Sequence, residues 1–237
     1  MWPLPRYKKE YVTINFSPTF VQCCWFQEGK KQGHPMCLKA WDKVFLHESQ
    51  LENLTLFNQS FISQFIQQFI KKYSLLHSYA FFGLTGPTVV EEYCSFITST
   101  PTNDDFFIKD KNKVWWDSFY LYPTVDGKFI FYVTSLKREL VFQYKLLACI
   151  NNLNLVTLIP RNAALFNLYK MVKGKGFSRS QLSLDMQNNN NQIYEVVADM
   201  NLNSFIEIDT RGMEPDQNED EKLDINSALA LFIAGRR

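Results

Sequence analysis

The sequence predicts an α/β fold built on a mixed sheet, and three observations lead to this fold class. Short apolar runs rich in aromatic and β-branched residues alternate with longer segments whose apolar residues recur at helical spacing. The change of period is clearest within 129–172, which has the pattern strand, helix, strand, helix. Near the start of the chain, three strand-like runs joined by turns favour an antiparallel meander.

The strands of the second half are expected at two almost wholly apolar runs. Phe129–Thr134 is rich in aromatic and β-branched residues, as a strand covered on both faces should be. Leu153–Ile159 is a second run of this kind, and Pro160 ends it. The compact pattern predicts that the two strands are parallel neighbours in one sheet, joined by a right-handed crossover.

Two helices are predicted around these strands. Ser135 can cap the first helix, whose apolar residues recur at helical spacing: Leu140, Val141, Tyr144, Leu147 and Ala148. Asn151 and Asn152 should stop it. Ala163–Val172 repeats the helical pattern and should close at Lys173–Gly174.

The first half predicts a meander followed by a long helix. Its strands are expected at Tyr11–Phe16, Phe20–Gln27 and Cys37–Leu46. Phe57–Leu76 carries one continuous apolar stripe, with Gln, Lys and Ser on the other face: Phe57, Phe61, Ile62, Phe65, Ile66, Phe69, Ile70 and Tyr73. We expect this stripe to pack on a mixed sheet of about five strands.

The remaining segments are predicted as further strands and polar connections. Tyr79–Leu84 and Thr88–Thr98 are strand-like, and Val114–Tyr122 should form a hairpin with the following strand through the turn 124–127. After Gly174 the chain is mostly polar until a small-residue-rich helix at 225–237. We therefore expect three units, at residues 1–113, 114–172 and 173–237.

Composition excludes several classes of function. The formal net charge of the 237 residues is +1, which gives no global electrostatic case for nucleic-acid binding. The five cysteines are odd in number and sit mostly in strand- or helix-like runs, which favours reduced thiols over a disulfide framework. The sequence shows neither a signal peptide nor an apolar run of the ~20 residues needed to span a bilayer, so we expect a soluble cytoplasmic protein.

No motif carries recognisable chemistry. His34 and Cys37 lack the further ligands that a zinc site requires, and there is no nucleophile elbow, P-loop or dinucleotide-binding motif. Gly83–Pro87 lies between two strand-like runs rather than before a helix, so it is expected to be a turn and not a phosphate cradle. The basic segment Lys173–Arg179 is expected to be a solvated loop. These observations predict no catalytic residue, no cofactor and no metal.

With these segments in place, the chain resembles a reduced member of the PilM family of actin-like type IV pilus and competence proteins. Val12–Phe26 is similar to the family's opening hairpin, and Tyr79–Val90 to its turn between strands. Phe129–Met171 resembles the strand, helix, strand, helix of its inserted subdomain, and Leu229–Arg237 its closing helix. The resemblance implies a truncated actin-like ATPase (ribonuclease H-like) fold with an inserted βαβα subdomain.

The departures from the family pattern concern the nucleotide site. The first phosphate loop of an actin-like ATPase places an Asp near the metal and uses Gly and Ser amides to hold phosphate. The corresponding degenerate positions in this chain are Asn15, Ser17, Pro18, Thr19 and Gln22. The second phosphate loop is absent from the sequence, so the nucleotide-binding half is expected to be lost and ATPase activity absent.

The resemblance implies a function in assembly rather than catalysis. PilM relatives receive the short cytoplasmic tail of the inner-membrane protein PilN in a cleft between the first and the inserted subdomains. We therefore expect a cytoplasmic scaffold of a pilus, competence or type II secretion apparatus, held at the inner membrane by a PilN-like partner. The sequence assigns no individual groove residues. Two alternatives stay open, an actin-like nucleotide-binding or hydrolysing enzyme with divergent motifs and a standalone α/β interaction module.

Overall fold

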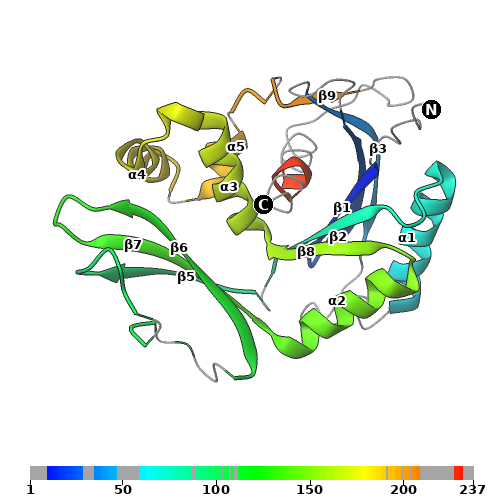
Figure 1. Ribbon diagram of the computed structural model, residues 1–237, viewed down its shortest axis with the longest axis horizontal. Coiled ribbons are helices and arrows are strands. Elements are labelled where there is room, and N and C mark those ends of the chain that lie inside the picture. Colours follow the sequence, from blue (N-terminus) through cyan, green and yellow to red (C-terminus); the bar gives the residue numbers. More distant parts are fainter. Residues whose placement is uncertain are drawn as a thin grey trace, which may run out of the picture.

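A computed structural model describes most of the chain. The described residues are 10–28, 35–46, 59–86, 89–102, 104–106, 108, 112–190, 192–198, 200–202, 204–208 and 227–231. In this part of the chain a six-stranded sheet and a three-stranded sheet are connected by helices, which confirms the predicted mixed α/β class (Figure 1).

The larger sheet has the strand order β8-β4-β1-β2-β3-β9. Its strands are β1 (Glu10–Phe16), β2 (Phe20–Gln27), β3 (Met36–Phe45), β4 (Tyr79–Leu84), β8 (Asn154–Pro160) and β9 (Ile206–Ile208). β1, β2 and β3 pair in antiparallel fashion, so the predicted meander is confirmed. β4 pairs with β1, β8 with β4 and β9 with β3, all parallel, which gives one more strand than the five expected.

Helices cover both faces of this sheet (Figure 1). The long predicted helix forms α1 (Gln59–Tyr73), and its stripe residues Ile62, Ile66, Phe69 and Ile70 are buried against one face of the sheet; the predicted start at Phe57 and Asn58 lies outside the described residues. Burying each such side chain contributes about 1.5–3 kcal/mol relative to exposure. α2 (Arg138–Ile150) packs beside α1 on this face.

The opposite face is covered by α3 (Arg161–Lys173) and a short helical segment at 227–231. All five residues of that segment are buried, and four of them, at 228–231, belong to the same apolar cluster as α3. The predicted closing helix is thus helical over 227–231, and its other residues, at 225–226 and 232–237, lie outside the described part.

The smaller sheet corrects one prediction. Its order is β5-β7-β6, with β5 (Val89–Phe96), β6 (Val114–Pro123) and β7 (Phe129–Lys137) all antiparallel. The expectation that Phe129–Thr134 and Leu153–Ile159 are parallel neighbours is wrong, because the first lies in β7 and the second in β8 of the larger sheet. An apolar run indicates burial but not the hydrogen-bonding partner. The expected unit 114–172 is therefore divided between the two sheets, as α2 leads the chain from β7 back to β8.

Most predicted helix ends are confirmed, with one exception. Ser135 does not cap α2, because β7 continues to Lys137, which is the N-cap residue and makes no side-chain capping bond. Asn151 is the C-cap of α2, and Gly174, with φ of 49°, ends α3. Left-handed φ values favour glycine, which explains why the helix stops at this residue.

The segment after Gly174 holds more regular structure than predicted. In place of a polar loop it forms α4 (Arg179–Asn188), α5 (Ile193–Ala198) and β9. Leu182 and Met186, four residues apart, are buried and hold α4 on the molecule. This region is rich in Asn, Gln and Ser, and its few apolar residues give too weak a periodic signal to predict a helix.

Candidate functional site

The positions that correspond to the degenerate phosphate loop lie at the C-terminal ends of parallel strands. Asn15 of β1 is level with Gly83 of β4, and Gly83 is level with Ile159 of β8. Open α/β sheets commonly bind ligands outside the carboxyl ends of their strands. This edge of the sheet is therefore a candidate ligand site.

The loop between β1 and β2 makes several hydrogen bonds within itself. Asn15 and Gln22 are buried, and Asn15 Nδ2 donates to Gln22 Oε1 at 3.2 Å. The amide of Ser17 donates to the Phe20 carbonyl at 2.9 Å, and that of Thr19 to Ser17 Oγ at 3.4 Å. Pro18 has no amide proton to offer. The structure therefore brings the five predicted positions together around one tight, internally bonded turn.

This arrangement does not fit a magnesium-bound nucleotide. Its central side chains are the neutral amides of Asn15 and Gln22, whereas Mg²⁺ in nucleotide sites is held by carboxylates and phosphates. The loop amides of Ser17 and Thr19 are already donated within the turn. Asn15 Oδ1 and Gln22 Nε2 have no hydrogen-bond partner among the described residues, but an amide oxygen and an amide nitrogen do not replace a metal ligand set.

A second polar group joins the small sheet to α3. The Glu91 carboxylate on β5 accepts hydrogen bonds from the Tyr132 hydroxyl on β7 and from Asn162 Nδ2 on α3, the latter at 3.1 Å. Burial around the carboxyl group raises the pKa of Glu91, opposed by the Tyr132 hydrogen bond, the nearby Arg161 charge and the Asn162 hydrogen bond. These residues are 30 to 71 positions apart in the chain, and sequence reasoning did not find them.

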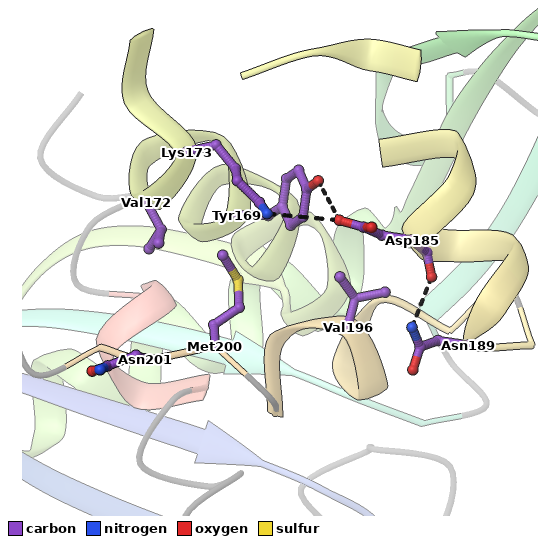
Figure 2. Close-up of a pocket in the computed structure, with 8 residues that line it drawn as sticks. All are labelled: Tyr169, Val172, Lys173, Asp185, Asn189, Val196, Met200 and Asn201. Carbon is purple, nitrogen blue, oxygen red and sulfur yellow. Dashed lines mark hydrogen bonds and ion pairs between the residues drawn. The ribbon is translucent and has the colours of Figure 1, made fainter. Parts of the chain in front are cut away.

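A half-open cavity of about 390 Å³ lies between α3, α4 and α5 (Figure 2). It is lined by Tyr169, Val172, Lys173, Asp185, Asn189, Val196, Met200 and Asn201. Pockets for small ligands range from roughly 300 to 1,000 Å³, so this cavity has room for a small ligand or an anchoring side chain. Sequence analysis missed it because it took Lys173–Arg179 and the following residues for loops.

The cavity has a charged side and an apolar side (Figure 2). The Tyr169 hydroxyl donates to Asp185 Oδ2 at 2.7 Å, and Lys173 Nζ lies 3.8 Å from the same oxygen. Burial and the neighbouring carboxylate raise the pKa of Tyr169. Val172, Val196 and Met200 form the apolar side, which suits an anchoring aliphatic or aromatic group.

Other candidates from the sequence do not form sites. His34 lies outside the described residues, and Cys37 is half-buried in β3. Within the described ranges no group of three or more His, Cys, Asp or Glu side chains could hold a metal ion. All five cysteines are described, and no disulfide joins any two of them. None of the helices in the described part is long and apolar enough to cross a bilayer.

Comparison with solved structures identifies the fold. The PilM–PilN type IV pilus biogenesis complex contains a chain that superposes with a TM-score of 0.53 at 15% sequence identity. The match covers 71% of this chain and 52% of that one, so this chain corresponds to about half the length of the known structure. The chain has an actin-like fold. The actin-like prediction from the sequence is thus confirmed at the level of fold.

Two further structures resemble the chain more weakly. The cytoplasmic domain of EpsL, an inner-membrane component of the type II secretion system of Vibrio cholerae, gives a TM-score of 0.41 at 10% identity, covering 66% of this chain and 57% of its own. A Bacteroides thetaiotaomicron protein with an actin-like ATPase fold and unknown function gives 0.37 at 7% identity, covering 72% and 59%. No protein-family model and no curated protein matches the sequence.

Proposed function

We propose that the chain is a non-catalytic scaffold of a pilus or type II secretion assembly system, which binds a short cytoplasmic segment of a PilN-like inner-membrane protein. The observation that carries this proposal is the fold shared with a chain of a structure named as the PilM–PilN type IV pilus biogenesis complex. Competence machinery is a further setting consistent with the sequence resemblance. The scaffold would be cytoplasmic and reach the inner membrane through its partner.

The geometry of the first loop supports a role without nucleotide hydrolysis. Phosphoryl transfer relies on positioned metal ions and amide or cationic donors around the phosphates. The β1–β2 turn offers neutral Asn15 and Gln22, a proline, and amides already bonded within the turn. The turn therefore offers neither a carboxylate ligand for the metal nor free backbone amides at Ser17 and Thr19 that would bind ATP–Mg.

The cavity between α3, α4 and α5 supports a role in peptide capture. Capture of a linear segment needs an apolar anchor pocket and hydrogen-bonding groups at its rim rather than acid–base residues. Val172, Val196 and Met200 supply the apolar side, and Lys173, Asp185 and Asn189 the polar side. α3 packs on β4 and β8, whereas α4 packs on β6, so the helices around the cavity contact both sheets.

The experiment is a tagged purification from detergent-extracted membranes of the native cell. The wild-type chain is compared with Met200→Glu, which places a charge in the cavity, and with Leu184→Glu, which places the same charge on the exposed face of α4. We expect a single-span membrane protein to co-purify with the wild type and the Leu184→Glu control, and to be lost with Met200→Glu at unchanged melting temperature. Recovery that is equal for both variants, or no membrane protein with the wild type, contradicts the proposal.

A further inference from the structure

The outer surface of α2 carries an exposed apolar stripe. Phe142, Leu146 and Ile150 follow one another at four-residue spacing and are 75%, 52% and 45% exposed. The buried residues of the same helix, Leu140, Tyr144, Leu147 and Ala148, point to the sheet. Residues four apart on a helix lie on one face, so the three side chains form a continuous row on the side away from the sheet. We call this row the α2 stripe.

The two helices on this face carry more basic than acidic side chains. The charged residues of α1 and α2, with the residue preceding α2, are five basic and one acidic, all exposed: Lys71, Lys72, Lys137, Arg138, Lys145 and Glu139. The whole chain has a net charge of only +1, so these two helices are more basic than the sequence as a whole. Exposed apolar side chains on a helix that also carries exposed Lys and Arg are typical of helices that lie in the interface of anionic membranes.

We propose that the α1–α2 face docks on the surface of an anionic lipid bilayer, with the α2 stripe entering the headgroup region. The occupant is identified by charge, because Lys137, Arg138 and Lys145 complement anionic headgroups. Phe142 on α2 is a bulky exposed aromatic side chain. Neither α1 nor α2 needs to unfold for docking, since the stripe residues already point outward from a helix that is packed on the core.

The arrangement of the fold leaves the other sites accessible during docking. α1 and α2 lie on one face of the large sheet, and α3 with segment 227–231 on the other (Figure 1). The cavity between α3, α4 and α5 therefore belongs to the layer that faces away from the bilayer. Lipid docking and capture of a protein segment are separate properties, and each can be lost without the other.

The test is co-sedimentation of the full chain with vesicles. One set contains phosphatidylethanolamine with phosphatidylglycerol, and the other contains phosphatidylcholine alone. We expect binding only to the anionic vesicles, weakened by salt. Phe142→Ser should lower the partition coefficient about tenfold and Lys145→Gln about fivefold, as expected for losing a buried aromatic ring and one cation at the headgroups.

Matched controls use exposed apolar and basic residues on other elements. Ile97→Ser, at the end of β5, and Lys170→Gln, on α3, should bind like the wild type. Equal binding to neutral vesicles, no binding by the wild type, or unchanged binding by Phe142→Ser overturns the proposal. These outcomes are distinct from failure of partner capture, which is measured with cavity variants and without lipid.

A second measurement uses the exposed thiol of Cys149, which lies on α2 beside the stripe. A polarity-sensitive fluorophore is attached to it in a chain carrying Cys37→Ala and Cys94→Ala. Addition of anionic vesicles should shift its emission to the blue, and addition of phosphatidylcholine vesicles should not. A blue shift produced by raising the protein concentration alone identifies a second copy of the chain as the occupant and overturns lipid docking. Tighter binding of an acidic amphipathic peptide than of vesicles overturns it in favour of a protein partner.

Discussion

Leu231 occupies the space above Gly83, near the C-terminal end of β4 in the large sheet. A Cβ atom added to Gly83 would lie 2.5 Å from Leu231 Cδ1 and 2.6 Å from Asn15 Oδ1. Both distances are far below ordinary van der Waals contact, so the absence of a side chain at Gly83 is what lets segment 227–231 approach β4. Segment 227–231 is thereby fixed beside the strand ends that hold the degenerate phosphate-loop positions.

Gly83→Ala is therefore expected to destabilise the protein by about 1–3 kcal/mol, as overpacking of a close-packed core does. The measurement is urea unfolding followed by circular dichroism. In a Leu231→Ala background the same substitution should cost less, because the removed methyl groups free the space that the new Cβ requires. Equal costs in the two backgrounds would show that Leu231 does not limit the space at Gly83.

The Glu91 carboxyl group is expected to make stability depend on pH. Burial raises its pKa in the folded state above the unfolded value, so the folded state binds a proton more tightly. The corresponding stability is present below the unfolded pKa and is lost as the pH rises through the folded pKa. Glu91→Gln should flatten this part of the pH profile of the unfolding free energy, because the amide cannot ionise.

Tyr132→Phe provides the matched comparison for Glu91. It removes the hydroxyl that donates to the carboxylate but keeps the buried ring. We expect a loss of about 1 kcal/mol near neutral pH, as for other hydrogen bonds to partly solvated groups. The loss should shrink at acid pH, where the protonated carboxyl group accepts the hydrogen bond less strongly. A constant loss across the profile contradicts the assignment of Glu91 as the titrating partner.

At the cavity, the hydrogen bond from Tyr169 to Asp185 should contribute more to the stability of the fold than the ion pair of Lys173 with Asp185. Lys173 Nζ is 3.8 Å from Asp185 Oδ2 and partly exposed, and such pairs contribute about 0–1 kcal/mol. The Tyr169 hydroxyl is only 2.7 Å from this oxygen, and hydrogen bonds to charged groups contribute about 1.5–3 kcal/mol. Tyr169→Phe should therefore lower the melting temperature more than Lys173→Ala does, and the reverse order would contradict this ranking.

The positions of helices and strands were more predictable from the sequence than the pairing of the strands. The meander, α1 and Tyr79–Leu84 were found from sequence because apolar periodicity reports directly which faces are buried. The pairing of β7 with β5 and β6 was not, since Phe129–Thr134 is apolar on both faces and fits either sheet. Strand pairing is decided by tertiary contacts that a single apolar run does not encode.

The candidate sites likewise divide into those with a local sequence pattern, which could be predicted, and those formed by tertiary contacts, which could not. Asn15 and Gln22 were found because they depart from a known loop pattern, and the hairpin register then brings them together. The Glu91–Tyr132–Asn162 group and the cavity around Asp185 have no local signature, because their residues meet only when α3, α4 and the small sheet are in place. Sequence analysis did not single out the α2 stripe, because its exposure depends on which side of the helix meets the sheet.

The last prediction concerns nucleotides. Titration of the wild-type chain with ATP and Mg²⁺ in a calorimeter should give no saturable heat at sub-millimolar concentration, because the β1–β2 turn has no carboxylate and its amides are internally bonded. Asn15→Asp supplies the missing carboxylate but not the amides, so it should not restore binding. Its buried charge should instead destabilise the fold by about 1–3 kcal/mol near neutral pH, and less at acid pH, because burial raises the folded-state pKa of the new carboxyl group above its unfolded value. Micromolar ATP binding by the wild type would contradict this prediction. ATP turnover that Asn15→Ala abolishes would show that this turn holds a nucleotide and that the chain is an enzyme.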